Sequence, residues 1–509
     1  MKARIVLLLA FIFASDFIFA QDWQSVRSGG EYYFSNPSGE IKAIRIDSVK
    51  TSGNHQFFYN YSTIRSTGDF SSCATAYGDS WIGRYVICRN DGMNFFLNYA
   101  HDTIRVKTTA NLNEVWNCFS FADGKHIDAK VSSISSSTFL GITDSVKTIS
   151  LQLKDQLGNP VIHFLNNYEL KLSKHCGLIK TANFYRFPDS VPIFSQFPPN
   201  EIQSQFEIYG MTNPQSGKTN ISFHEVFDFQ AGDEFHSRHT FFSWQPPGQI
   251  DTTFTIKKVL ERINYPGNDS VKYSFERIEK KIIYGQPSSQ IIHTWDTISE
   301  VIYFNAFPSL DFNKLPGELI RGFYISNDEF VMQMNLYCNE RRSKTIPGGY
   351  GHFVGFYPND SCMQALIIMD GCLPEKTYIE GCGGPYGGCA GAIMSEHNEL
   401  LFYKKGTEQC GTPLDPGILL GIDKAKTSSG IKLSVYPNPA CDNVSFAIEN
   451  AHDLSYVLEL SNLLGQIVLK KQILQNSFTV NLSALPKGVY HYQLKSKQQS
   501  VANGKLLLQ

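Results

Sequence analysis

From residue 431 to residue 509, hydrophobic residues stand at every second position of four short runs. This period places the apolar side chains on one face of an extended strand and the polar side chains on the other. The alternating positions are Val444, Phe446 and Ile448; Tyr456, Leu458 and Leu460; Phe478, Val480 and Leu482; and Tyr490, Tyr492 and Leu494. Gly, Pro and Asn separate the runs, as is typical of turns between antiparallel strands. The pattern predicts a small all-β module.

The body of the chain shows the same alternation. Two clear examples are Ile149, Leu151 and Leu153, and Val271, Tyr273 and Phe275. Short runs at close spacing favour antiparallel strands in a sandwich or meander over a doubly wound parallel sheet. The predicted fold class is therefore all-β, with a large antiparallel β-rich body followed by a small Ig-like β-sandwich.

Fixed turn and strand residues punctuate the last module. In this respect residues 431–509 resemble the type A C-terminal sorting domain of proteins exported by type IX secretion. The positions that carry the resemblance are Tyr436, Pro437, Asn438, Pro439, Gly465, Leu485, Pro486, Gly488, Tyr490, Lys505 and Leu506. The body also resembles stretches of uncharacterised cargo proteins of this system. The resemblance implies that the type IX secretion machinery is a partner and that the sorting domain can attach the protein to the outer-membrane surface.

The first residues of the chain contain a second targeting signal. Lys2 and Arg4 precede an apolar run, and a small residue, Ala20, stands before Gln21. A basic start, a short apolar run and a small residue predict a secretory signal peptide. We therefore expect entry to the periplasm, followed by release or display at the outer membrane. No later segment reaches the ~18 apolar residues that a transmembrane helix requires.

The ~400 residues between the signal peptide and the sorting module exceed one ordinary core, so they should form more than one unit. With the terminal segments and the linker, we expect five parts. The expected parts are a signal peptide (1–20), a β-rich body of one or two units (21–335), a Gly/Cys-rich disulfide-stapled region (336–421), a linker (422–430) and the sorting domain (431–509).

The chain contains 11 cysteines, which suits an oxidising compartment. Cys441 lies inside the sorting module, and the other ten are disulfide candidates. These are Cys73, Cys88, Cys118, Cys176, Cys338, Cys362, Cys372, Cys382, Cys389 and Cys410. We expect at least two bridges between Cys338 and Cys410, where glycine leaves little room for a hydrophobic core. Cysteine spacing alone leaves the connectivity open.

One segment concentrates imidazoles and carboxylates. Its members are His224, Glu225, Asp228, Asp233, Glu234, His236 and His239. Such side chains can bind zinc or calcium, but the spacing matches neither the H-E-x-x-H motif nor an EF-hand loop. Neighbouring phenylalanines favour two strands joined at Ala231-Gly232, with the polar groups on solvated faces. We therefore predict no metal site and no cofactor here.

Other candidate motifs also favour structural roles. The glycine-rich segment 381–391 contains two cysteines, which favours a stapled turn over a phosphate-binding loop. His175 and Cys176 are adjacent, and neighbours on a strand point to opposite faces, which argues against a catalytic pair. No Gly-x-Ser-x-Gly motif occurs. We accordingly predict no catalytic residue.

Composition separates the remaining classes of function. A net charge of −2 with dispersed basic residues gives no basis for nucleic-acid binding. Aromatic residues make up 13% of the chain, and a minority of them must lie on the surface, where they can bind a glycan or protein. The sequence favours a non-catalytic binding or adhesion module. The alternative is a secreted hydrolase of proteins or glycans, whose paired acids sequence spacing cannot identify.

Overall fold

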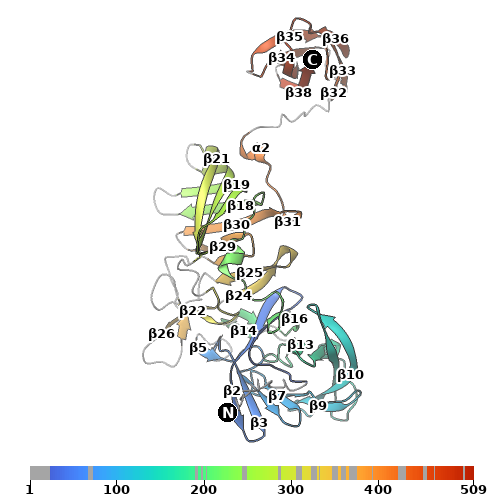
Figure 1. Cartoon of the computed structure of the whole chain (residues 1–509), viewed down its shortest axis with the longest axis vertical. Coiled ribbons are helices and arrows are strands. Elements are labelled where there is room, and N and C mark those ends of the chain that lie inside the picture. The colour runs from blue at the N-terminus through green and yellow to red at the C-terminus, as the bar shows by residue number, and fades with distance from the viewer. Residues whose placement is uncertain are drawn as a thin grey trace, which may run out of the picture. The chain divides into compact units, whose positions relative to one another are not determined.

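The computed structural model describes residues 23–421 and 432–509 apart from short internal segments. Those segments are 67–72, 190–192, 197–198, 202, 244–248, 285–287, 305–311, 322–328, 332, 347–353, 357–362, 366–374, 392–393, 451–454, 464 and 497–498. The predicted signal peptide (1–20) and linker (422–430) lie outside the described residues. Strands account for 63% of the structure and helices for 4%, which confirms the all-β prediction. Figure 1 shows the strands along the chain.

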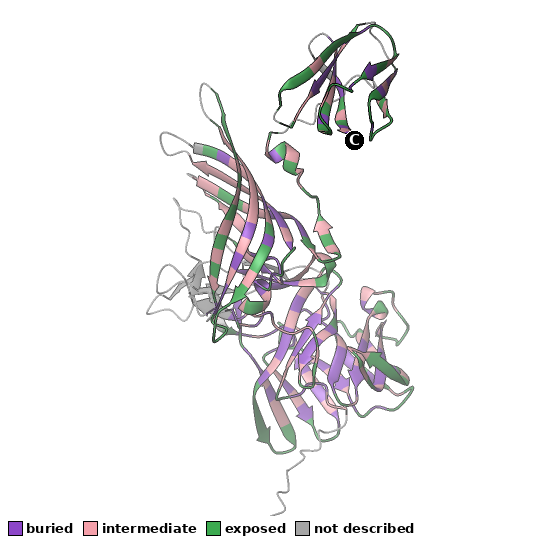
Figure 2. Cartoon of the chain, turned by 45° about the horizontal axis from the view of Figure 1, so that its top comes forward, coloured by how far each residue is buried: buried purple, intermediate pink, exposed green. Residues whose placement is uncertain are grey.

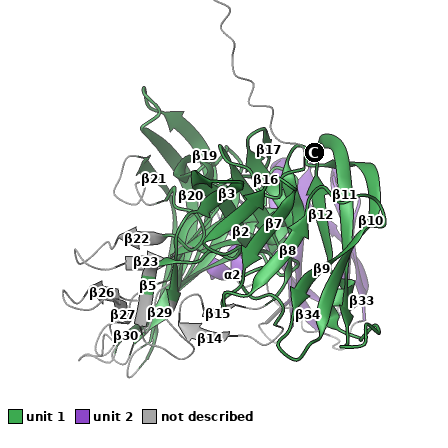
Figure 3. Cartoon of the chain, turned by 90° about the horizontal axis from the view of Figure 1, so that it is seen from below, with its two compact units in different colours: residues 1–414 green, residues 415–509 purple. Residues whose placement is uncertain are grey.

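The chain divides into two compact units, Met1–Leu414 and Asp415–Gln509. Figure 3 colours them separately. In unit 1, 23 strands form one hydrogen-bonded network in which every strand pair is antiparallel. Two hydrophobic cores lie along this network, one for each half of unit 1.

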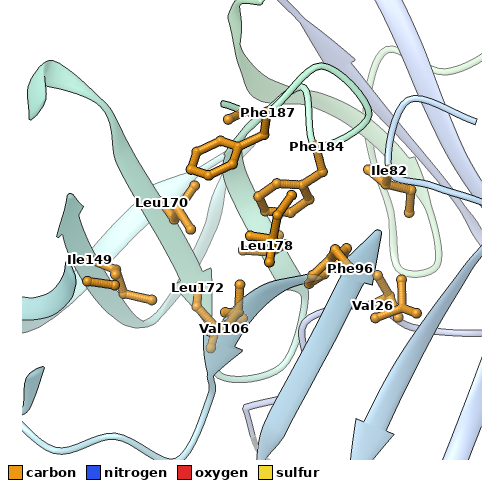
Figure 4. Close-up of a cluster of buried hydrophobic side chains, with 14 of the residues drawn as sticks. Val26, Ile82, Phe96, Val106, Ile149, Leu170, Leu172, Leu178, Phe184 and Phe187 are labelled. Carbon is orange, nitrogen blue, oxygen red and sulfur yellow. The ribbon is translucent and has the colours of Figure 1, made fainter. Parts of the chain in front are cut away.

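Thirteen strands build the first half of unit 1. They are β1 (Glu31–Ser35), β2 (Glu40–Ser52), β3 (His55–Asn60), β6 (Tyr85–Arg89), β7 (Met93–Leu97), β8 (Thr103–Lys107), β9 (Val115–Ser120), β10 (His126–Phe139), β11 (Ile142–Lys154), β12 (Glu169–Ser173), β13 (Gly177–Ala182), β16 (Gln205–Thr212) and β17 (Gln215–Gly217). Their inward side chains and those of the connecting segments form the core shown in Figure 4, where Phe96 on β7 packs against Phe184 after β13. Ile149, Leu151 and Leu153 are all buried there, as their alternation predicts.

Ten strands build the second half of unit 1. They are β18 (Glu234–Ser243), β19 (Gln249–Asn264), β20 (Ser270–Tyr284), β21 (Gln290–Tyr303), β24 (Gln333–Tyr337), β25 (Arg341–Ile346), β28 (Lys376–Ile379), β29 (Gly383–Ala390), β30 (Met394–Lys405) and β31 (Glu408–Gly411). The first half joins this group through β2 and β24. Strands of the Gly/Cys-rich region therefore belong to the same network as the body, since β30 pairs with β18.

Shorter elements complete unit 1. The small sheets contain β4 (Thr63–Ser66), β5 (Cys73–Gly78), β26 (Val354–Phe356) and β27 (Met363–Ala365); β14 (Ile193–Gln196) and β15 (Pro199–Glu201); and β22 (Leu319–Arg321) and β23 (Glu329–Val331). The helices are η1 (Phe164–Asn167), α1 (Phe223–Val226) and η3 (Cys338–Glu340). Among the described residues, none of the helices is long and apolar enough to cross a membrane.

Unit 2 contains the short helix α2 (Pro416–Leu419) and two sheets that enclose their own core. One sheet contains β32 (Lys432–Tyr436), β33 (Asn443–Glu449) and β36 (Ser477–Asn481). The other contains β34 (Tyr456–Ser461), β35 (Ile467–Ile473), β37 (Gly488–Ser496) and β38 (Gln499–Leu508). Val444, Phe446, Leu458, Leu460 and Leu494 are buried between them, as the alternation predicts. The sandwich has a separate core and fits the predicted Ig-like module.

Two local predictions are wrong. The segment before Ala231-Gly232 contains the one-turn helix α1 rather than a strand, because Ser222 and Glu225 cap its first turn reciprocally. The glycine-rich segment contains the strand β29 rather than only a turn. A Cβ atom at Gly388 would lie 2.0 Å from the Glu396 carbonyl oxygen, so glycine is what lets β29 approach β30.

The cysteines divide into paired and free groups. Cys338 and Cys410 form a disulfide with their Cα atoms 6.3 Å apart, and Cys389 is also disulfide-bonded. Four other candidates, Cys88, Cys118, Cys176 and Cys382, are buried free thiols and form no disulfide in the structure. They pack among core side chains, where a thiol behaves as a small apolar group. Cys441 is free and exposed. The side chains of Cys73, Cys362 and Cys372 lie outside the described residues.

One buried cation stands out in the second core. The ammonium group of Lys344 on β25 is fully buried, lies 4.7 Å from the Phe312 ring centroid and donates hydrogen bonds to the carbonyl oxygens of Phe312 and Lys314. Burial disfavours the charged form and lowers the pKa of Lys344 from 10.5 to about 7, although Glu318 and Glu31 oppose this shift.

We predict that Lys344 makes stability depend on pH. Between pH 7 and pH 10.5 the unfolded chain binds a proton that the folded chain lacks, so stability falls as the pH is lowered through this window. Denaturant unfolding of the Lys344→Met variant should show a smaller gain in stability across the window than the wild type, by a few kcal/mol. The exposed Lys258→Met variant is the control. Equal pH slopes for Lys344→Met and wild type would contradict the prediction.

Candidate functional site

In unit 2, the opening turn of the predicted sorting motif is joined to the tail. The side-chain amide of Asn438 donates to the Lys505 carbonyl oxygen at 2.8 Å and accepts from the Leu507 N–H at 3.0 Å. Asn438 thus pairs with β38 as a peptide group would. Beyond it, the Ala440 N–H donates to the Leu507 carbonyl, and the Gln509 N–H donates to the Ala440 carbonyl, both at 2.8 Å. The two ends of the module are therefore locked together.

The late turn and strand of the motif meet the same tail. Tyr490 lies opposite Leu506 in the β37–β38 pairing, and Gly488 lies opposite Leu508. Leu506 is fully buried, whereas Lys505 points to solvent. The Tyr490 hydroxyl donates to the Pro486 carbonyl oxygen at 2.6 Å, which fixes the turn before β37. Five of the eleven predicted motif positions therefore lie on or beside one strand, β38: Asn438, Gly488, Tyr490, Lys505 and Leu506.

The other motif positions shape neighbouring parts of the module. Gly465 adopts a φ of 79° in the connection between β34 and β35, and its N–H donates to the Asn462 carbonyl. Leu485 packs against the core in the turn between β36 and β37. Tyr436 ends β32 and is 53% exposed. Pro437 and Pro439, which follow it, are also exposed. These exposed residues leave part of the motif open to a partner.

Sequence reasoning missed two positions that shape this module. A Cβ atom at Gly504 would lie 2.2 Å from the Tyr492 hydroxyl oxygen, so a larger residue there would displace the Tyr492 ring across the β37–β38 pairing. Glu459 on β34 binds Lys495 at 2.7 Å and Lys470 at 2.9 Å, and these hydrogen bonds lower the pKa of Glu459. In the sequence, the position of Glu459 between Leu458 and Leu460 was the one available indication of this role.

The imidazoles and carboxylates of residues 224–239 do not converge in the structure. Glu225 binds Arg342 at 2.6 Å, Asp228 binds Arg262, and Asp233 binds Lys405. His224 stacks on Phe304 with ring centroids 3.7 Å apart. The described residues contain no group of three or more His, Cys, Asp or Glu side chains arranged to hold a metal ion.

The histidines on β18 take separate partners. His236 is buried, donates through Nε2 to Glu234 at 2.6 Å and accepts the Leu414 N–H at Nδ1. Burial lowers the pKa of His236 and outweighs the effect of Glu234, so the ring stays neutral. His239 pairs with Glu396 on β30 at 2.9 Å. The Glu234 contact lies within β18, whereas the Leu414 and Glu396 contacts join β18 to neighbouring segments.

His175 and Cys176 lie in the turn between β12 and β13. Asp144 accepts hydrogen bonds from the Ser173 hydroxyl and the His175 N–H, and it contacts His175 Nδ1 at 2.9 Å. Burial opposes ionisation, but these bonds prevail and lower the pKa of Asp144. Burial raises the pKa of the Cys176 thiol. The Cys176 thiol is held in its protonated form, and the neighbouring Ser173 hydroxyl donates to Asp144. These contacts stabilise the turn and do not activate Cys176 as a nucleophile.

An exposed apolar face lies on β21. Because successive side chains alternate, Ile291, Trp295 and Tyr303 share one face, and they are 52%, 66% and 61% exposed. Ile298 and Ile302 project to the other face and pack against the second core. Figure 2 shows how much of the long strands of this sheet is exposed or half-buried.

The Trp295 ring is held in place although it faces solvent. Its indole N–H donates to Glu276 Oε1 at 3.0 Å, across the β20–β21 pairing. A shallow hollow of about 320 Å³ lies beside the ring, lined by Leu260, Glu276, Trp295, Asp296 and Thr297. The sheet thus presents a fixed aromatic platform next to hydrogen-bonding groups.

Comparison with known proteins identifies the last module. Residues 434–509 match the family described as the secretion system C-terminal sorting domain. No curated protein matches the chain. A similar solved structure is PorZ, an essential bacterial surface component of the type-IX secretion system of Porphyromonas gingivalis, at 9% identity over 91% of this chain and 75% of that chain. Its TM-score is 0.14, so the likeness carries no argument about the fold.

The match and the geometry agree on the class of this module. It is a C-terminal sorting domain of type IX secretion, assembled around β38. The protein is therefore one that this system sorts to the cell surface or the extracellular space, and the secretion machinery is its partner.

We predict that export depends on the Asn438 contacts with the tail. Asn438→Ala removes both hydrogen bonds to β38, which typically contribute about 1 kcal/mol each. The fraction of protein found outside the cell should fall towards that of a chain lacking residues 431–509, which should stay inside the cell. Fractionation and immunoblotting measure both. Asn503→Ala, an exposed substitution on the same strand, should leave export unchanged. Normal export of Asn438→Ala would contradict the prediction.

Proposed function

We propose that this protein is a non-catalytic binding module that type IX secretion displays at the cell surface or releases, and that its ligand is a glycan. The predicted signal peptide would bring it to the periplasm before the sorting domain completes export. The observation that carries the proposal is the exposed Trp295 platform on β21.

The chemistry of this platform suits a sugar ring. A pyranose presents a face of C–H groups that packs on an aromatic ring, and its hydroxyl groups hydrogen-bond to flanking polar side chains. Trp295 supplies the ring, while Glu276 and Thr297 lie beside it. The Glu276 hydrogen bond already fixes the ring, so little side-chain entropy is lost when a ligand binds.

A glycoside hydrolase would need two carboxylates that converge on one bond, ~5–10 Å apart. At this platform the strand register separates the two acids. Glu276 lies opposite Thr297, whereas Asp296 lies opposite Arg277, so Glu276 and Asp296 project to opposite faces of the sheet. Asp296 is also held by Arg277 through bonds of 2.9 and 2.6 Å. This arrangement favours binding over glycoside hydrolysis at Trp295.

We predict that Trp295→Ala weakens glycan binding at least about tenfold, because the ring supplies the stacking surface. Binding of the purified protein to a panel of polysaccharides, by affinity electrophoresis and calorimetry, tests this. Tyr77→Ala removes a similarly exposed aromatic residue elsewhere in unit 1 and should have no effect.

The same polysaccharides should be recovered without new reducing ends after incubation. Release of sugar by the wild type would support the hydrolase alternative. Failure of the wild-type protein to bind any polysaccharide, or unchanged binding by Trp295→Ala, would overturn the proposed function.

A further inference from the structure

The inner face of the same sheet carries a second, separate cavity. It has a volume of about 160 Å³ and lies between β18–β21 and the β28–β29 hairpin. Five aromatic side chains line it: Phe227, Phe229, Phe235, Phe275 and Tyr386. A dry apolar cavity of about 150 Å³ is large enough for one benzene ring. This cavity therefore matches a single six-membered aromatic ring in both size and lining.

Glycine residues keep part of the wall free of side chains. Gly383 has a φ of 81°, and a Cβ atom there would lie 3.0 Å from Phe229 Cζ. Gly384 has a φ of 143°, and its Cβ atom would lie 2.6 Å from the Thr377 carbonyl oxygen. The backbone itself therefore forms this wall, and a larger residue would displace Phe229 or the neighbouring strand.

The rim of the cavity carries one charge of each sign. Lys257 Nζ lies 2.5 Å from Glu300 Oε1, and the two side chains are 33% and 38% exposed. The Lys257 ammonium also lies 5.4 Å from the Phe275 ring centroid, directly at the aromatic lining. Because partly exposed ion pairs contribute little to stability, this pair can open towards a ligand at small cost.

We propose that this cavity binds a free aromatic amino acid as its zwitterion. The ring occupies the aromatic cavity, the α-carboxylate pairs with Lys257, and the α-ammonium pairs with Glu300. An aromatic acid without an amine would leave Glu300 without its counter-charge, and an aromatic amine without a carboxylate would leave Lys257 without one. A ligand that carries both signs next to a ring can replace the Lys257–Glu300 pairing and bind both charges at once. This site is independent of the glycan platform, because the two lie on opposite faces of the sheet.

The reactivity of Cys382 can show whether a ligand occupies the cavity. It lines the cavity, and its thiol is free. Burial raises the pKa of Cys382 to about 12, although Arg341 opposes the shift, so the thiol is protonated and reacts slowly. A ring seated in the cavity covers this sulfur. Occupancy should therefore slow alkylation of Cys382, while alkylation of exposed Cys441 stays unchanged.

Calorimetry on the purified full chain tests the proposal with four probes. L-phenylalanine should bind at least about tenfold more tightly than 3-phenylpropionate, phenethylamine or L-alanine. L-phenylalanine should also slow the modification of Cys382 by iodoacetamide, measured by peptide mass mapping. If L-phenylalanine does not bind at millimolar concentration, or if all the aromatic probes bind equally, the proposal is wrong.

Variants assign the rim charges. Lys257→Met should remove the preference for L-phenylalanine over phenethylamine, and Glu300→Gln should remove the preference over 3-phenylpropionate. Lys258→Met and Glu261→Gln change exposed charges on the same strand and should bind as wild type does. Ser237→Leu fills the cavity from β18 and should abolish binding without lowering the melting temperature. If the two rim variants keep the full wild-type selectivity, the assignment is overturned. The probe series on the wild type decides the proposal even where a variant fails to fold.

Discussion

The pairing of β18 with β30 holds the second half of the body together. These strands lie about 160 positions apart in the sequence, yet they pair along their whole length from Glu234–Lys404 to Ser243–Met394. Side chains reinforce the backbone ladder, since Arg238 binds Glu399 at 2.5 Å and His239 binds Glu396. β19, β20 and β21 are added to the other edge of β18 in order. The pairing of β18 with β30 therefore joins the consecutive strands β18–β21 to β29 and the Gly/Cys-rich region.

Alternation along the strands then gives the two faces different properties. On β20, Phe275 turns to the aromatic cavity, whereas the next residue, Glu276, turns to the Trp295 platform. A shift of the β20–β21 register by one residue would exchange the faces and bury Glu276. The bulge in β19 between Val259 and Glu261 adds a local irregularity beside Leu260, which lines the outer hollow. One geometric rule therefore places the Trp295 platform and the aromatic-lined cavity on opposite faces of the same strands.

Much of the fold was predictable from local pattern. Val271, Tyr273 and Phe275 alternate in the sequence and are all buried, and the sorting motif identified the last module before any contact was known. The wrong predictions came from competing local effects. Ser222 and Glu225 form a capping box that favours helix in a phenylalanine-rich segment, and the glycines of β29 satisfy close strand contact rather than break the strand.

The candidate sites were less predictable, because they depend on contacts between distant segments. Trp295 and Glu276 meet only through the strand register, and the cavity needs residues from six separate stretches of chain. The sequence could state that some aromatic residues must be exposed, but not that Trp295 would be one of them. The free cysteines could not be predicted for the same reason. Cys88 and Cys382 are buried in separate cores, and their spacing in the sequence does not show this.

The contacts of Asn438 and Ala440 with β38 have a consequence for the timing of export. The sorting domain takes its shape only when residues 438–440 can pair with residues 505–509. During synthesis the first of these segments emerges from the ribosome long before the second. A chain cut short within β38 retains the body but lacks the partner strand for the opening turn. An export signal built in this way also reports that synthesis has passed β38, because its opening turn has no partner until residues 505–509 have been made.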